Sequence, residues 1–364
     1  NAVVVCLVSS IVLTAIYLIF ADIILAMFGG TVNEETYRHS QEYFFYITLG
    51  IPFYMFGQAM NPVIRADGDP RFAMISTLAG AVLNIILDPV FIFALNMGVR
   101  GAALATILSQ AVSCAWVVRF LCSEKSTLRL RVKNLLPDMK LLLPCLALGL
   151  SPFLMQITEN LVAVSFNVTL LRFAGDTAVG AVTVLTTTMS LCMQLLHGLT
   201  QGAQPIMSFN YGAGKGQRVR ETFRILFISC LTGSMLVWAV CMLFPGAVAG
   251  MFTPDAELSS YTAWAMRIYM AASGIFGIQI ACQQSFVALG QAKVAIFLAL
   301  LRKVILLIPL IYILPHFFAD KAFAVFLAEP VADFGAVALT SFTFYRQFRR
   351  SMRELEGAEA TGER

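Results

Sequence analysis

The stretch NIILDPVFIF, residues 84 to 93, places a carboxylate inside an otherwise apolar run. Asn84 and Asp88 stand one helical turn apart, and Pro89 follows the acid directly. An aspartate at the centre of a lone membrane-spanning helix costs roughly 2.5 to 3.5 kcal/mol on insertion scales, so we expect Asp88 to face a bundle interior or a wet cavity. Pro89 cannot donate a hydrogen bond to the carbonyl of Ile85, which leaves an oxygen free near the acid.

The residues around this carboxylate have the chemistry of a cation site. Small and polar side chains recur at helical spacing on one face, at Thr77, Gly80, Ala81, Asn84 and Asp88. Thr106 lies at the same depth on the next predicted helix, and Tyr43 on the preceding one could reach this layer. Such oxygen donors suit Na⁺, with Asp88, Asn84 and Thr106 as ligands, and a protonatable carboxylate suits H⁺ equally. The alternative is that Asn84 and Asp88 only hydrogen-bond neighbouring helices.

A second set of polar and charged residues lies in the other half of the chain. A polar stripe after Pro152 comprises Gln156, Glu159, Asn160, Ala163 and Asn167. Arg302 lies about 10 residues inside its predicted span, roughly 15 Å deep at 1.5 Å per residue, so it needs a partner. Asp333 has a similar depth on the next helix, and Glu329 is one turn away from it. We predict a structural Arg302–Asp333 ion pair; the alternatives are a direct role in substrate or ion coupling, and a pairing of Glu159 with Arg302.

Composition indicates the elements that must position these residues. Hydrophobic residues make up 59% of the 364 and charged residues 13%, and the mean hydropathy is +0.79, whereas soluble domains carry about 25% charged residues. Runs of about 20 apolar residues, long enough to cross a bilayer, recur from end to end. The sequence therefore predicts an all-α polytopic membrane protein with ten spans, at residues 1–28, 42–61, 73–95, 100–121, 144–171, 177–200, 223–249, 259–288, 292–314 and 323–345.

The distribution of Lys and Arg predicts the orientation of these spans. One set of alternate loops holds 18 basic residues and the opposite set holds 4. Because basic residues are retained on the cytoplasmic side of short loops, we expect a multi-pass protein of the cell (inner) membrane with its carboxyl terminus in the cytoplasm. The pI of about 8.6 then reflects topology, and no nucleic-acid partner is expected because no single face gathers the charge.

The two halves of the chain are related by a weak repeat. A shift of 222 residues superposes RADGDPRFAMI on VALGQAKVAIF and matches Gly68 with Gly290 and Ala73 with Ala295. Four predicted spans precede Gly290 in the second half, whereas two precede Gly68 in the first, so we expect a fragment lacking the first two of twelve helices. The predicted parts are an amino-terminal lobe with four of its six helices (1–121), an interlobe linker (122–143), a six-helix carboxyl-terminal lobe (144–346) and a cytoplasmic tail (347–364).

Four motifs resemble the bacterial multidrug and toxic compound extrusion (MATE) transporters. They are NPVIRADGDPRF, LNIILDPVFIFALNMGVRGAALAT, GLTQGAQPIMSFNYGAGK and VALGQAKVAIFLALLRKVILLIPL. The resemblance implies a 6+6 helix bundle of two lobes that exports amphipathic, often cationic compounds by antiport with H⁺ or Na⁺. It places Asn84, Asp88 and Thr106 in the cation site, and in some branches a Glu near Glu159 takes part in coupling. The substrate-binding candidates are Asn61, Gln156, Glu159 and Asn160.

Other function classes fit the sequence less well. Lys215 is followed by Gly216 rather than Ser or Thr, so the phosphate-loop motif is absent and no ATP partner is expected. The three His are isolated and the eight Cys contain no CxxC pair, which argues against an enzyme and against a cofactor. A flippase for lipid-linked oligosaccharide from the same superfamily is the nearest alternative, although it would carry more basic residues in its cavity; a channel is the third. We expect a monomer in the lipid bilayer with small amphipathic, drug-like substrates.

Overall fold

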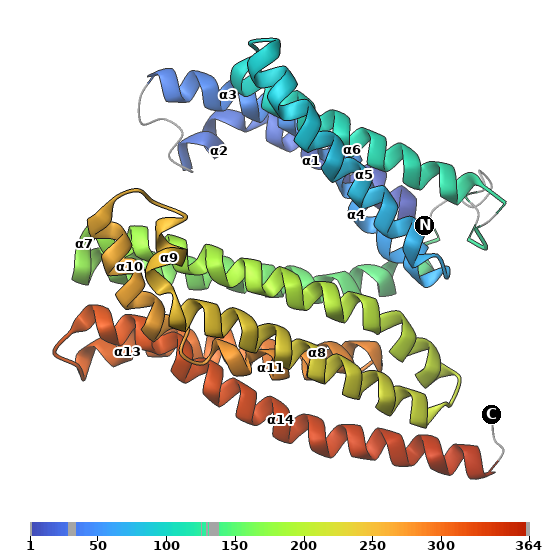
Figure 1. The fold of residues 1–364 in the computed structure, drawn as a ribbon. Coiled ribbons are helices and arrows are strands. Elements are labelled where there is room, and N and C mark those ends of the chain that lie inside the picture. The colour runs from blue at the N-terminus through green and yellow to red at the C-terminus, as the bar shows by residue number, and fades with distance from the viewer. Residues whose placement is uncertain (1, 28–33, 125, 129, 131–137, 362–364) are drawn as a thin grey trace. The chain divides into compact units, whose positions relative to one another are not determined.

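The computed structural model describes residues 2–27, 34–124, 126–128, 130 and 138–361. These residues fold into helices and contain no strand, which confirms the all-helical class (Figure 1). The chain divides into two compact units, Asn1–Ala147 and Leu148–Arg364. The boundary falls shortly after the predicted linker 122–143, of which residues 125, 129 and 131–137 lie outside the described residues, as do residues 1, 28–33 and 362–364.

The first unit is built around the packing of three helices, α4, α5 and α6. Their buried ends meet in a core that includes Met60, Ile64, Ala73, Phe120 and Leu121. The elements of this unit are α1 (Ala2–Ile19), α2 (Ala21–Met27), α3 (Glu34–Leu49), α4 (Ile51–Ala66), α5 (Pro70–Pro89), the π-helix η1 (Val90–Ala94) and α6 (Gly98–Cys122).

The second unit contains the remaining helices and a larger core. Phe166, Leu170, Leu185, Met266 and Phe326 are among its fully buried side chains. Its elements are the part of α7 (Met139–Gly212) from Leu148 onward, α8 (Gly216–Leu243), α9 (Pro245–Gly250), α10 (Ala256–Tyr269), the 3₁₀ turn η3 (Ser273–Ile275), α11 (Phe276–Ala288), α12 (Ala292–Leu300), the π-helix η4 (Leu301–Leu307), α13 (Ile308–Ile313), the 3₁₀ turn η5 (Leu314–His316) and α14 (Lys321–Thr361).

Seven of the described helices are long and apolar enough to cross a membrane, or eight if the bent pair Ala256–Tyr269 and Ser273–Ala288 forms one span. One of the seven, Gln156–Gly212, includes Gly175 with φ +75°, where two predicted spans join across a kink. The predicted span 42–61 is not among the seven, because the helix breaks at Gly50 into α3 and α4 of 16 residues each. Side chains such as Ile85 and Phe209, 71% and 80% exposed, provide the apolar outer surface that lipid requires.

The internal repeat reappears as two turns of the same geometry. Gly68 between α4 and α5 has φ +102°, and Gly290 between α11 and α12 has φ +75°. In each turn the amide of the residue after the glycine donates a hydrogen bond to the carbonyl oxygen five residues earlier. Asp69 N donates to Ile64 O at 3.3 Å, and Gln291 N donates to Phe286 O at 2.8 Å. Both are Schellman-type helix ends, which require the left-handed conformation that glycine adopts without steric cost.

The turn at Gly68 is also tied to the segment that follows α6. Asp67 accepts hydrogen bonds from the hydroxyls of Thr127 and Ser126, the latter at 2.8 Å. The Thr127 hydroxyl, followed by the Ser126 hydroxyl and nearby amides, lowers the pKa of Asp67 below its ordinary value. Asp67 therefore stays ionised at neutral pH and anchors the start of the predicted linker to the first unit.

Candidate functional site

A cavity of about 270 Å³ opens between α4, α5 and α6 of the first unit. Its wall is mainly small and uncharged polar side chains, with two aromatic rings from α4. The lining residues are Phe53, Tyr54, Gly57, Gln58, Asn61, Thr77, Gly80, Ala81, Asn84, Thr106, Ser109, Gln110 and Ser113. The polar stripe that the sequence places on residues 77 to 84 therefore forms one wall of a real cavity.

Two polar contacts and one glycine hold these helices in place. Asn61 Nδ2 of α4 donates to Ala73 O and Thr77 Oγ1 of α5, at 2.9 and 3.1 Å. Ser113 Oγ of α6 donates to Ser76 O of α5 at 2.8 Å. A Cβ at Gly80 would lie 3.2 Å from Ser109 O, so the absence of a side chain there lets α5 and α6 approach closely. Asn61, predicted to bind substrate, thus lines the cavity and also ties α4 to α5.

Asp88 lies one turn beyond the cavity wall and contacts it through Asn84. Asn84 Nδ2 donates to Asp88 Oδ1 at 3.2 Å, and both residues are half-buried. After Pro89 the backbone widens into the π-helix η1, at whose end Leu95 N donates to Val90 O, five residues back, at 2.9 Å. A π segment directly after a helical proline is a break often found at functional sites. It follows the predicted acid immediately.

The structure brings together part of the predicted cation site. Thr106 and Asn84 line the same cavity from α6 and α5, although the Thr106 hydroxyl donates to Ala102 O at 3.0 Å. Among the described residues that line the cavity, the tyrosine is Tyr54 of α4 rather than Tyr43, which lies on α3 and is 40% exposed. The roles of Asp88, Asn84, Thr106 and Tyr43 in binding a cation stay predictions.

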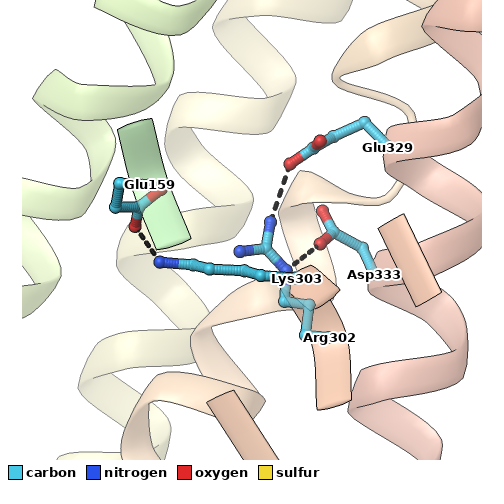
Figure 2. Close-up of polar contacts among 5 residues, drawn as sticks. All are labelled: Glu159, Arg302, Lys303, Glu329 and Asp333. Carbon is cyan, nitrogen blue, oxygen red and sulfur yellow. Dashed lines mark hydrogen bonds and ion pairs between the residues drawn. The ribbon is translucent and has the colours of Figure 1, made fainter. Parts of the chain in front are cut away.

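A buried charge cluster occupies the second unit (Figure 2). Arg302 Nε lies 2.6 Å from Asp333 Oδ1, and Arg302 Nη2 lies 2.7 Å from Glu329 Oε1. Lys303, the next residue of η4, points the other way and pairs with Glu159 of α7. We call these five residues, Glu159, Arg302, Lys303, Glu329 and Asp333, the charge cluster.

Burial distinguishes the members of the charge cluster. Arg302 is 7% exposed, Glu329 4% and Asp333 1%. The guanidinium of Arg302 also stacks over the ring of Phe276, 4.4 Å from its centroid, which adds a cation–π contact. By contrast, the side chain of Glu159 is 54% exposed. The cluster therefore has a sealed centre at Arg302 and an accessible edge at Glu159.

The polar stripe of α7 forms the exposed face beside that edge. Gln156, Glu159, Asn160 and Asn167 are all exposed, while Val162 and Ser165 on the opposite face are buried, at 9% and 6% exposed. The partner of Glu159 is Lys303 and not Arg302. Lys303 lies within the predicted span 292–314, but the sequence does not indicate its partner, because a neighbour on another helix depends on how each helix is rotated about its axis.

Comparisons with known proteins were made on sequence and on fold. The sequence profile of the MatE family matches residues 1–90 and 152–313. The multidrug export protein MepA of Staphylococcus aureus (strain N315) is 25% identical over 326 residues, which cover 88% of this chain and 70% of that protein. MepA of Staphylococcus haemolyticus (strain JCSC1435) is also 25% identical, over 91% of this chain and 73% of that one.

Solved structures share the fold. The MATE multidrug transporter DinF-BH is 36% identical, with a TM-score of 0.80 over 93% of this chain and 76% of that one. An outward-facing multidrug resistance MATE family transporter of the MOP superfamily gives a TM-score of 0.88 at 21% identity, over 96% of this chain and 78% of that one. This likeness confirms the predicted two-lobe helical bundle.

Proposed function

Because this chain belongs to the MatE family of membrane transporters, we propose that it is a secondary active exporter of amphipathic, cationic compounds, driven by inward movement of H⁺ or Na⁺. Its apolar helices make it a multi-pass membrane protein. In the proposal it lies in the cell membrane with its carboxyl terminus in the cytoplasm. It acts as a monomer, uses neither ATP nor a cofactor, and is not an enzyme.

The observation that carries the proposal is the cavity of the first unit with Asp88 beside it. Its wall offers amide and hydroxyl groups to a solute, and the aromatic rings of Phe53 and Tyr54 offer apolar and cation–π contact. Asn84 belongs to the cavity wall and hydrogen-bonds Asp88. An ion bound at Asp88 would therefore change the wall that a solute contacts, which is the differential interaction that coupling requires.

The proposal is tested by efflux from proteoliposomes. The purified full chain is reconstituted with a fluorescent lipophilic cation inside, and a pH gradient or a Na⁺ gradient is imposed separately. We expect one of the two gradients to accelerate loss of the cation, and ATP to have no effect. Equal loss with and without both gradients, from protein that still binds the cation, would contradict antiport and favour a channel.

A matched pair of variants tests whether the cavity holds the substrate. Ala81 lines the cavity and its neighbour Val82 does not, although both are exposed on α5. Ala81→Phe should fill the cavity and weaken binding of the lipophilic cation at least tenfold, whereas Val82→Phe should leave affinity within about twofold. Equal affinities of the two variants would place the substrate elsewhere.

A further inference from the structure

A second cavity, of about 490 Å³, lies between α8, α11 and α14 of the second unit. These three helices pack against one another (Figure 1). The wall combines phenylalanine rings from α8 and α14 with Ile278 and Cys282 of α11, and two arginines complete it. The transport site proposed above uses residues of the first unit, so it leaves this cavity without a role.

Stacked aromatic rings form the apolar part of the wall. Phe223 of α8 lies on Phe344 of α14 with ring centroids 4.5 Å apart, and Phe344 lies on Phe348 at 4.8 Å. Phe227 continues the row along α8, 5.8 Å from Phe223. Residues four positions apart lie on the same face of a helix, so both helices turn their rings toward the cavity. A ligand there meets hydrocarbon surface.

The two arginines, Arg220 of α8 and Arg349 of α14, are both exposed. Each stands just outside a predicted span, 223–249 or 323–345, on the side with the excess of basic residues. Arg349 Nη1 donates to the hydroxyl of Tyr345 at 3.3 Å, and its guanidinium lies 6.0 Å from the centre of that ring. Because a guanidinium has five N–H donors, Arg349 can keep this contact and also bind an anion.

The turn of α14 that follows Arg349 is fixed to the second unit. Gln291 Nε2 donates to Ser351 Oγ at 2.9 Å. Met352 and Leu355 are buried, at 1% and 4% exposed. These contacts hold the helix that carries Arg349 in place, so a ligand does not have to order it on binding.

Charge and depth together indicate the ligand. The described residues that line the cavity include two arginines and no acid, so an anion is favoured and a cation is repelled. Phe227 lies about 10 Å deeper than Arg220 at 1.5 Å per residue along the helix. The cations therefore stand at the level of lipid headgroups and the rings at the level of acyl chains. A molecule with one anionic end and one long apolar end matches this order.

We propose that this cavity binds one anionic phospholipid of the cytoplasmic leaflet. Its phosphate lies between Arg220 and Arg349, since the fork of a guanidinium matches the oxygens of a phosphate. An acyl chain lies along the stacked rings. A zwitterionic lipid fits less well, because its ammonium group meets two cations and no acid on the wall. The inference goes beyond the proposed transport and does not depend on it.

The first test counts bound lipids by native mass spectrometry of the purified full chain in detergent. The first palmitoyl-oleoyl-phosphatidylglycerol should bind at least tenfold more tightly than the first phosphatidylcholine with the same chains. Arg220→Gln combined with Arg349→Gln should reduce this preference to about twofold. The matched pair Arg218→Gln and Arg350→Gln removes the same charge from the same two helices, at positions that do not line the cavity, and should keep the preference.

Two results of this test would overturn the proposal. Equal binding of the two lipids by the unaltered chain would show that the cavity does not select an anionic headgroup. Equal losses in the two arginine pairs would show that lipid follows the general surface charge and not this cavity. All four arginines are exposed, so these variants should fold, and thermal unfolding without lipid checks that they do.

The second test blocks the apolar part of the cavity. Ser341 lines the cavity, whereas Ala338, exposed on the same helix, does not. Ser341→Phe should weaken binding of phosphatidylglycerol at least fivefold, and Ala338→Phe should leave it within about twofold. Phosphatidylglycerol should also raise the melting temperature of the unaltered chain and of Ala338→Phe, because a ligand stabilises the folded state that binds it, but not that of the Arg220/Arg349 pair. Unchanged lipid binding by a folded Ser341→Phe protein would place the lipid elsewhere.

Discussion

Arg302 Nε lies 2.6 Å from Asp333 Oδ1, although the two residues are 31 positions apart and belong to different helices. The sequence predicts this contact, because both residues lie at a similar depth when residues are counted from the ends of their predicted spans. A cation about 10 residues inside an apolar span cannot reach water with its own side chain, so an acid at the same depth is the available partner.

Removing either member of this pair should destabilise the protein. Arg302→Met should lower the free energy of unfolding by about 3–5 kcal/mol, because it leaves the buried carboxylates of Asp333 and Glu329 without a cation. Asp333→Asn should lower it by less, because Arg302 keeps its contact with Glu329. The loss in the double variant should be smaller than the sum of the two single losses. Unfolding by denaturing detergent in mixed micelles measures the free energy of unfolding of the single and double variants. Strictly additive losses would show that the two residues do not interact.

The exposed pair Arg100–Glu42 is the matched control for this cycle. Its atoms are 2.5 Å apart, but the side chains are 52% and 24% exposed. Because water screens such a pair, its removal should destabilise the protein far less than removal of Arg302.

Alanine at either repeat glycine should strain the backbone. Gly68 and Gly290 have φ of +102° and +75°, and an added Cβ would meet no atom within 4 Å at either position. The cost is therefore conformational, about 1–2 kcal/mol each. Gly202 in α7 also has open space around it but lacks positive φ, so Gly202→Ala should be neutral or up to about 1 kcal/mol more stable. Thermal unfolding in detergent distinguishes the three; an unaffected Gly290→Ala would contradict the shared turn geometry.

The sequence predicted those features that depend on the residue spacing within a single helix or turn. The stripe from Thr77 to Asn84 follows from helical spacing, and it lines a cavity. The glycine turns at Gly68 and Gly290 follow from the repeat, and they have the same hydrogen bonds. Features that depend on the rotation of one helix against another were not predictable. Tyr54 rather than Tyr43 lines the cavity, and Lys303 rather than Arg302 contacts Glu159. The sequence gives the depth of each side chain in the membrane, but only the packing of the helices decides which of two side chains at equal depth makes the contact.

The orientation in the membrane can be checked with single cysteines in a background that lacks the native ones. Lys140 and Gln217 are exposed in the first turns of α7 and α8, at helix ends predicted to lie on the basic side, whereas Ala319 is exposed in a loop predicted to lie on the opposite side. In intact cells an impermeant thiol reagent should label Ala319→Cys only, because the 18 to 4 excess of basic residues holds the other two positions in the cytoplasm. Labelling of Lys140→Cys or Gln217→Cys from outside would reverse the orientation.

The most direct test of the proposed mechanism is cation efflux by Asp88→Asn under a fixed pH or Na⁺ gradient. The amide keeps the size of the side chain and its contact with Asn84, so insertion, folding and affinity for the solute in detergent should be retained. Efflux should fall at least tenfold, since an ion that no longer prefers one state of the transporter shifts no equilibrium. Thr106→Val removes one oxygen and no charge, so its efflux rate should fall least of the three variants. The efflux rate of Asn84→Leu should lie between those of Thr106→Val and Asp88→Asn. Efflux by Asp88→Asn at the wild-type rate under both gradients would show that the carboxylate is structural and that coupling lies elsewhere.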